Sequence, residues 1–97
     1  MEDNEKVKSL ILRELIKKCK FGGAHAPLDF ITGNLPDEFL HNKQGQKAIQ
    51  KAVKDLINDE WVVVLMKKTG KGSDLHVSVN PRKIREISEY VQSGKNS

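Results

Sequence analysis

Apolar residues recur at helical spacing over the first part of the chain. Between Glu5 and Lys20 they recur every three to four positions, singly or as adjacent pairs, and Lys6, Arg13 and Lys17 occupy the opposite side. The apolar positions are Val7, Leu10, Ile11, Leu15, Ile16 and Cys19. Leu12 and Ile16 widen this stripe beyond what one packing contact requires. The pattern predicts an amphipathic helix from Glu5 to Lys20 whose extra apolar surface covers a neighbouring helix or a second subunit.

Glycine and proline interrupt the helical pattern after Lys20. Residues 21–27 include paired glycines, which stop a helix, and Pro27, which suits the first turn of a new one. We therefore expect a short second helix from Pro27 to about Thr32. One further helical turn over residues 37–40 is expected before the next element.

The strongest helical pattern covers residues 43–58. Asn42 precedes it and is a favourable N-cap residue. With about 100° of rotation per residue, the apolar and the lysine side chains fall on opposite faces. The apolar face holds Ala48, Ile49, Ala52, Val53, Leu56 and Ile57, and the basic face holds Lys43, Lys47, Lys51 and Lys54. This segregation predicts a third helix with one buried and one exposed basic face.

The next segment has the composition of β-structure. Residues 61–66 form a β-branched and aromatic run that is too short for a helix, which predicts a buried strand. Residues 75–79 alternate between apolar and polar, which predicts a strand with one buried face. Because the turn-rich residues 69–74 join the two runs, we expect a β-hairpin.

A last, shorter helix is predicted after the hairpin. Asn80 and Pro81 supply an N-cap and a first-turn proline. Ile84, Ile87 and Val91 then follow at helical spacing. We expect residues 1–92 to form a single domain, because 97 residues suffice for only one, and residues 93–97 to be a disordered polar tail.

Composition indicates a globular protein of the cytoplasm. Apolar residues make up 37% and charged residues 31% of the chain, and no apolar run approaches the ~20 residues that cross a bilayer. The acidic start, residues 1–5, is unlike a secretory signal. Cys19, the single cysteine, excludes an internal disulfide and is expected to be a packed thiol on the rim of the first helix. We therefore expect no membrane partner.

The order of the expected elements is that of a winged helix-turn-helix. The run Ile49, Ala52, Val53, Leu56, Ile57, Trp61 and Val62 resembles the recognition-helix signature of small prokaryotic and archaeal winged-helix transcription regulators. The resemblance extends from about Val7 to Val91. It implies an α+β fold with three N-terminal helices, a two-stranded β-hairpin wing and a C-terminal helix. Two departures stand out, since Glu60 replaces a frequent glycine and the link through Pro36 is longer than usual.

Charge distribution suggests where such a protein would meet DNA. The net charge of +4 permits a polyanionic partner. No Asp or Glu occurs between Phe39 and Lys54 or between Trp61 and Ser73, which gives two basic surfaces free of acids. In the fold that the chain resembles, the helix over 43–58 enters the major groove. The wing over 67–74 then reaches adjacent phosphates or the minor groove.

The candidate site combines lysines for phosphates with amides for bases. Gln44 and Gln50 are suited to pair with an adenine edge, and Gln46 less so because it lies toward the apolar side. The expected DNA-binding residues are Lys43, Gln44, Lys47, Gln50, Lys51, Lys54, Lys67, Lys68, Lys71 and Ser73. The resemblance also implies a possible homodimer, with contacts from Leu12, Ile16, Ile87, Tyr90 and Val91.

Other chemistry finds little support in the residues. Residues 70–73 lack the full phosphate-loop pattern, and His25, His41 and His76 are scattered without metal-ligand spacing. No nucleophile and base or paired acids converge, so we expect no enzyme, no cofactor and no metal. Two alternatives stay open: a winged-helix module for protein contacts within a larger assembly, and binding of RNA in place of DNA.

Overall fold

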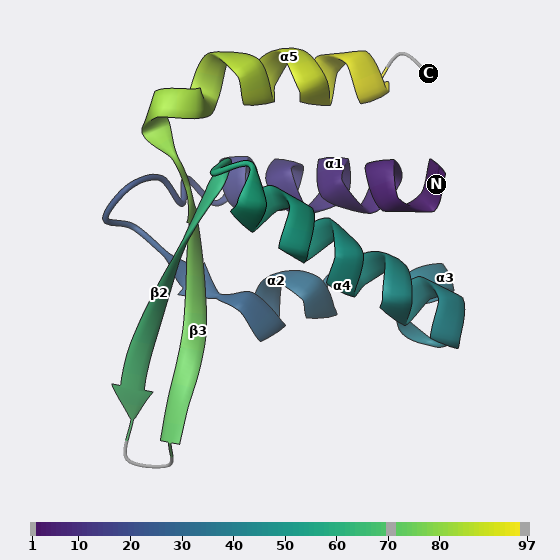
Figure 1. Ribbon diagram of the computed structural model, residues 1–97, viewed down its shortest axis with the longest axis horizontal. Helices are drawn as coiled ribbons and strands as arrows, with labels where there is room; N and C mark the ends of the chain where they lie inside the picture. The colour runs from purple at the N-terminus through teal and green to yellow at the C-terminus, as the bar shows by residue number, and fades with distance from the viewer. Residues whose placement is uncertain (1, 70–71, 96–97) are drawn as a thin grey trace.

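The computed structural model describes residues 2–69 and 72–95 as an α+β fold (Figure 1). Its elements follow in the order α1 (Glu2–Lys17), β1 (Ala26–Pro27), α2 (Leu28–Gly33), α3 (Asp37–Leu40), α4 (Lys43–Asn58), β2 (Val62–Thr69), β3 (Gly72–Val79), the 3-10 turn η1 (Pro81–Lys83) and α5 (Ile84–Lys95). The predicted bounds of α4 are confirmed. None of the helices described is both long and apolar enough to cross a membrane.

The sheet differs from the expected two-stranded hairpin. Within the described residues it has three antiparallel strands in the order β1-β3-β2. The β2–β3 ladder runs from Val62 opposite Val79 to Thr69 opposite Gly72, so the hairpin strands are longer than expected. Ala26 pairs with Val77, which makes a strand of a segment whose Pro27 was expected to open a helix. The two-residue β1 exists through its pairing with β3, and no sequence period reveals it.

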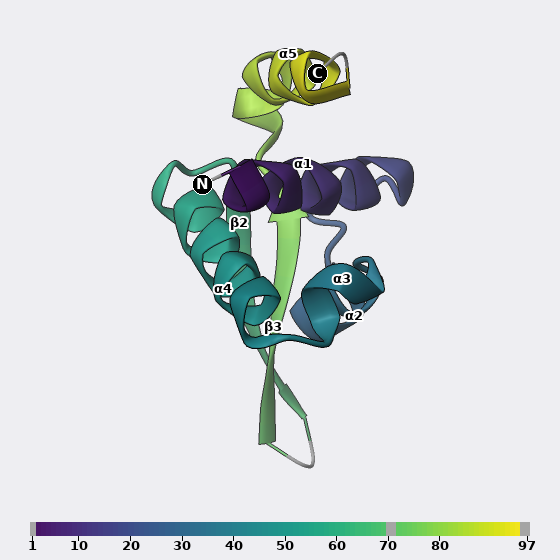
Figure 2. The same ribbon diagram turned by 90° about the vertical axis from the view of Figure 1, so that its right-hand side faces the viewer.

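The helices are stacked on one another, with α1 in the middle (Figures 1 and 2). In both views α1 lies between α5 and the pair α2 and α4 (Figures 1 and 2). In the part of the chain described, four helices precede the hairpin, where three were expected, because the turn over 37–40 is a separate α3. The buried core joins α1, α2, α4, the sheet and α5 through residues that include Ile11, Leu15, Ile31, Leu56, Val77 and Ile87.

The wide apolar stripe of the first helix is explained by packing on two sides. Helix α1 contacts both α4 and α5, and Leu12 is fully buried, so the expected cover by a neighbouring helix is confirmed. Ile87 of α5 is fully buried as well. The expected dimer surface is therefore wrong in its composition, because Leu12 and Ile87 are already covered within one chain.

Helix α1 ends three residues earlier than expected, in a left-handed turn. Cys19 has φ of 56°, its N–H donates to the Ile16 carbonyl (3.0 Å), and the N–H of Lys20 donates to the Leu15 carbonyl (2.9 Å). This is the Schellman pattern that usually has glycine at the left-handed position. Cys19 is exposed, so the expectation of a packed thiol was wrong.

The last helix also departs from its expected limit. The Asn80 side chain accepts from the Arg82 N–H (3.1 Å), which confirms the predicted cap. Helix α5 then continues to Lys95, so residues 93–95 of the expected tail are helical. The remaining two residues of that tail lie outside the described part of the chain.

Candidate nucleic-acid interface

The exposed face of α4 carries a row of lysines. Lys43, Lys47 and Lys54 are all exposed, and among the described residues none of them has a carboxylate within ion-pair distance. The three positions lie within about 40° of helical rotation and span about 16 Å along the axis. The arrangement presents three ammonium groups in one line along the helix.

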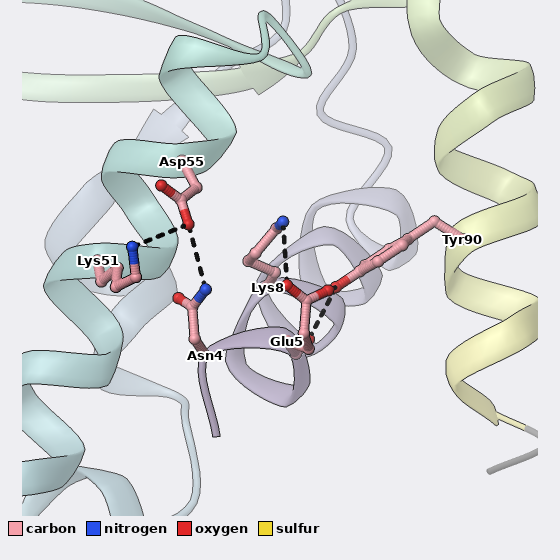
Figure 3. Close-up of polar contacts among 6 residues, drawn as sticks. All are labelled: Asn4, Glu5, Lys8, Lys51, Asp55 and Tyr90. Atoms are coloured by element: carbon pink, nitrogen blue, oxygen red, sulfur yellow. Dashed lines mark hydrogen bonds and ion pairs between the residues drawn. The ribbon is translucent and has the colours of Figure 1, made fainter. Parts of the chain in front are cut away.

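Lys51, the fourth predicted lysine, lies on the flank of this row. Its Nζ is 3.8 Å from the Asp55 carboxylate, which also accepts a hydrogen bond from the Asn4 side chain (3.1 Å) (Figure 3). By helical geometry Lys51 is rotated about 60° from Lys54, toward the start of α1. Its charge is thus partly balanced within the chain, which the sequence prediction did not anticipate.

The three glutamines of α4 have different surroundings. Gln50 is exposed beside the lysine row, and Gln44 is exposed on the flank that carries Lys51. Gln46 donates through Nε2 to the Leu40 carbonyl (2.7 Å), so its amide is occupied at the end of α3. Gln50 also lies beside the lysine row, but its side-chain amide makes no hydrogen bond within the described part of the chain.

Two open grooves run along the Gln50 side of α4. One, of about 530 Å³, lies between the end of α3 and the first turns of α4, and His41 contributes to its wall. The other, of about 380 Å³, lies between α2 and α4 and includes Thr32 and Asn58. Gln50 lines both grooves. Sequence reasoning missed these neighbours because only the folding of α2 and α3 brings them beside α4.

The groove between α2 and α4 has an apolar floor and one acid. Ile57, expected on the buried face, is 37% exposed there beside Val53. Asp29 from the first turn of α2 also lines it. A carboxylate at this position disfavours a phosphate close to α2, and so favours contact with polyanions nearer the lysine row.

The start of α4 is fixed by Asn42 and Gly45. The Asn42 side chain accepts from the Gly45 N–H (2.6 Å) and donates to the Glu38 carbonyl of α3 (2.7 Å). A Cβ on Gly45 would lie 2.5 Å from Cα of Phe39, so the two backbones touch. The turn between α3 and α4 is thereby held, and with it the direction in which the lysine row points.

The end of α4 leads directly into the hairpin. Glu60 has φ of 62°, its N–H donates to the Ile57 carbonyl (3.0 Å), and the Trp61 N–H donates to the Leu56 carbonyl (3.0 Å). Glu60 therefore adopts the left-handed conformation that glycine usually supplies at a helix end. The helix and β2 keep a short, defined connection despite the absence of glycine.

The hairpin extends past α2 and α4, and both views show no helix against its far half (Figures 1 and 2). Lys68 is exposed there. Lys71 and the side chains of Lys67 and Ser73 lie outside the described part of the structure. The expectation of a buried strand over 61–66 was wrong for its exposed residues: Val63 is 48%, Leu65 47% and Met66 57% exposed. Val63 and Leu65 alternate with the buried Val62 and therefore lie on the sheet face away from the helices, whereas a buried strand was expected.

Two of the three histidines meet across the sheet. His25 and His76 place their Nδ1 atoms 2.8 Å apart, with the rings edge to face. His41 is elsewhere, 3.6 Å from Asp37. Among the described residues no group of three or more potential metal ligands occurs. The histidine pair bridges β3 and the residue before β1, which ties the short strand to the hairpin.

Tyr90 anchors α5 to α1. Its hydroxyl lies 2.6 Å from a carboxylate oxygen of Glu5 (Figure 3), and burial, the hydrogen bond to Glu5 and the charge of Glu5 raise the pKa of Tyr90. Lys8 is almost fully buried, 3.6 Å from Glu5 and above the rings of Trp61 and Tyr90. Tyr90, expected in a dimer contact, is thus already engaged within the chain.

Comparison with protein-family models, with curated proteins and with solved structures found no match to this chain.

Proposed function

We propose that this protein is a winged helix-turn-helix protein that binds double-stranded DNA and regulates transcription. The order of helices α2, α3 and α4, followed by a hairpin after three residues, supports this fold. In such a protein α4 is the recognition helix and the β2–β3 hairpin is the wing. Gln50 reads bases, and the lysines of α4 and Lys68 contact phosphates.

The observation that carries the proposal is the lysine row of α4. Lys43, Lys47 and Lys54 lie exposed along one line and carry no ion pair among the described residues. A helix with its side chains is about 10–12 Å across and fits the major groove, which is about 12 Å wide. Phosphates on both sides of the groove are then within reach of the lysines, and each contact releases condensed counterions.

The test is fluorescence anisotropy of a labelled random-sequence duplex, titrated with the protein at several salt concentrations. We expect log affinity to fall linearly with log salt, with a slope near −0.9 for each phosphate contact. The variant Lys47→Gln/Lys54→Gln should bind more weakly at every salt concentration, and its slope should be smaller by about 2. The variant Lys51→Gln should lose less DNA affinity than a single substitution in the lysine row, because Asp55 already balances part of the Lys51 charge.

A matched control removes the same charge elsewhere. Lys17 and Arg85 are exposed on α1 and α5, so Lys17→Gln/Arg85→Gln changes the net charge equally. This control should keep the slope of the unmodified protein. Absence of binding at low salt would refute DNA binding, and equal losses in the two double variants would refute α4 as the contact surface. Competition between duplex DNA and duplex RNA distinguishes the two nucleic acids.

One observation favours a second candidate, a module for protein contacts. Strand β2 exposes Val63, Leu65 and Met66, and the groove between α2 and α4 exposes Ile57. Exposed apolar side chains gathered on one element often mark a protein interface. If the duplex titration shows no binding at low salt, this candidate replaces the first.

A further inference from the structure

Strand β2 leaves one of its edges unpaired. Because the sheet order is β1-β3-β2, the outer edge of β2 faces no other strand among the described residues. The Asn80 N–H donates to the Trp61 carbonyl (2.9 Å), so these two residues form a hydrogen-bonded pair of the ladder. Pairs alternate in type along an antiparallel ladder. The backbone N–H and C=O groups of Val62, Val64, Met66 and Lys68 therefore point outward.

The side chains beside this edge are apolar. Val63 and Leu65 are each about half exposed on the sheet face away from the helices, and Met66 is more than half exposed. Long, apolar edges with free hydrogen-bonding groups are avoided in monomers, because they pair with other chains. An eight-residue edge of this kind is what a second strand would cover.

We propose that β2 pairs antiparallel with β2 of a second copy of this chain, about a two-fold axis at Val64. In this register Val64 lies opposite Val64 of the second copy, and Val62 lies opposite Met66 of the second copy. These are the residues whose backbone groups point outward, so each pair exchanges hydrogen bonds. Val63 then faces Leu65 of the second copy in the closer type of pair, which buries both exposed side chains.

Charge complementarity selects this register. The ladder of this register ends where Val62 pairs with Met66 of the second copy; Glu60, in the left-handed turn just before β2, then lies beside Lys68 of the second copy, and two-fold symmetry repeats the contact. Both side chains are exposed, and neither has an ion-pair partner among the described residues. An axis at Met66 would instead set Lys68 against Val64. An axis at Val62 would set Glu60 against Val64, and axes at Val63 and Leu65 would set Glu60 against Met66 and Lys68 against Val62. None of these registers brings the two charges together.

The resulting dimer has one continuous six-stranded sheet, with three strands from each copy. It does not rest on the proposed DNA binding: the lysine row of α4 takes no part in it, and Lys68 is the one residue that the two proposals share. It replaces the dimer surface predicted from the sequence, whose Leu12 and Ile87 are buried. The partner is a second copy because the edge is complementary to itself in both apolar side chains and charge.

The test is light scattering after size exclusion, over a series of concentrations, with circular dichroism to verify folding. The unmodified protein should approach twice its mass of 10.9 kDa. Leu65→Lys should be monomeric, and so should Met66→Pro, which removes an outward N–H without touching the β2–β3 ladder. As a matched control, Leu75→Lys places the same charge at an exposed position of β3 and should remain dimeric.

A charge exchange tests the register. Glu60→Lys and Lys68→Glu should each weaken self-association about tenfold, because two attractive cross-strand pairs become repulsive. The combined variant Glu60→Lys/Lys68→Glu should restore it. A monomer at every concentration would overturn the proposal, and so would a dimer that Leu65→Lys leaves intact. Failure of the combined variant to restore association would overturn the axis at Val64.

Discussion

Gly45 is the position where α3 rests directly on α4, and we expect Gly45→Ala to destabilise the protein. The added Cβ would lie 2.5 Å from Cα and 2.6 Å from the carbonyl carbon of Phe39, and closer still to its oxygen. These are backbone atoms, so no side-chain rotation relieves the overlap. Helix α3 would have to withdraw by roughly 1 Å from a closely packed contact.

The size of the effect follows from two opposing contributions. Alanine in place of glycine within a helix ordinarily gains about 1 kcal/mol. Overpacking of this kind costs about 1–3 kcal/mol, and disturbing the Asn42 bridge between α3 and α4 costs about 1 kcal/mol more. The net loss of unfolding free energy should be about 1–3 kcal/mol. Under the proposed function, DNA affinity should fall as well, because α4 changes direction.

A second glycine offers the matched control. Gly33 ends α2, and a Cβ there would meet nothing within 4 Å. Gly33→Ala should leave stability unchanged or raise it by up to about 1 kcal/mol. Urea unfolding followed by circular dichroism measures both variants, read as a shift of the midpoint at constant m-value. Equal stability of the two variants would refute the backbone contact between α3 and α4.

Three further changes probe the helix ends and the α1–α5 contact. Asn42→Ala should lower the unfolding free energy by about 1–2 kcal/mol, because the side chain serves both α3 and α4; a thermal midpoint equal to that of the unmodified protein would contradict this. Glu60→Gly should raise stability by about 0.5–1 kcal/mol by relieving the left-handed φ and removing an acid from a helix C-terminus; a lower urea midpoint would contradict it. Tyr90 keeps its proton in the folded state above its ordinary pKa of 10.0, so stability should fall as pH rises past that value. Tyr90→Phe should be less stable at neutral pH, and its deficit should shrink in urea titrations above pH 10; a constant deficit would argue against the Glu5 hydrogen bond.

Local signals predicted α4 well. Asn42 marks its start, and the separation of lysines from aliphatic residues marks its length, since each follows from the helix alone. The elements that were missed depend on tertiary structure. Strand β1 is formed by pairing with Val77. Helix α1 ends at Lys17 in a turn whose left-handed residue is Cys19, and no glycine in the sequence indicates this end.

The sequence predicted which face of α4 carries the lysines, but not which of these lysines contact other parts of the chain. The period of α4 placed Lys43, Lys47 and Lys54 together, which the exposed row confirms. It could not separate Lys51 from them, because that distinction depends on Asp55 and its contact with α1. The exposed apolar side chains of β2 were also missed, since an unbroken apolar run does not reveal that helices cover only one face of the strand.

Glu60 connects the fold to the proposed dimer. A charged residue in a left-handed conformation costs about 1–2 kcal/mol, a cost that proteins keep mainly where a residue has another role. The pairing of Glu60 with Lys68 of a second copy supplies such a role. Glu60→Gly should therefore have two effects of opposite sign: a higher urea midpoint for the isolated chain at low concentration, and weaker self-association in light scattering. A variant that gained stability without losing association would leave the left-handed glutamate without that explanation.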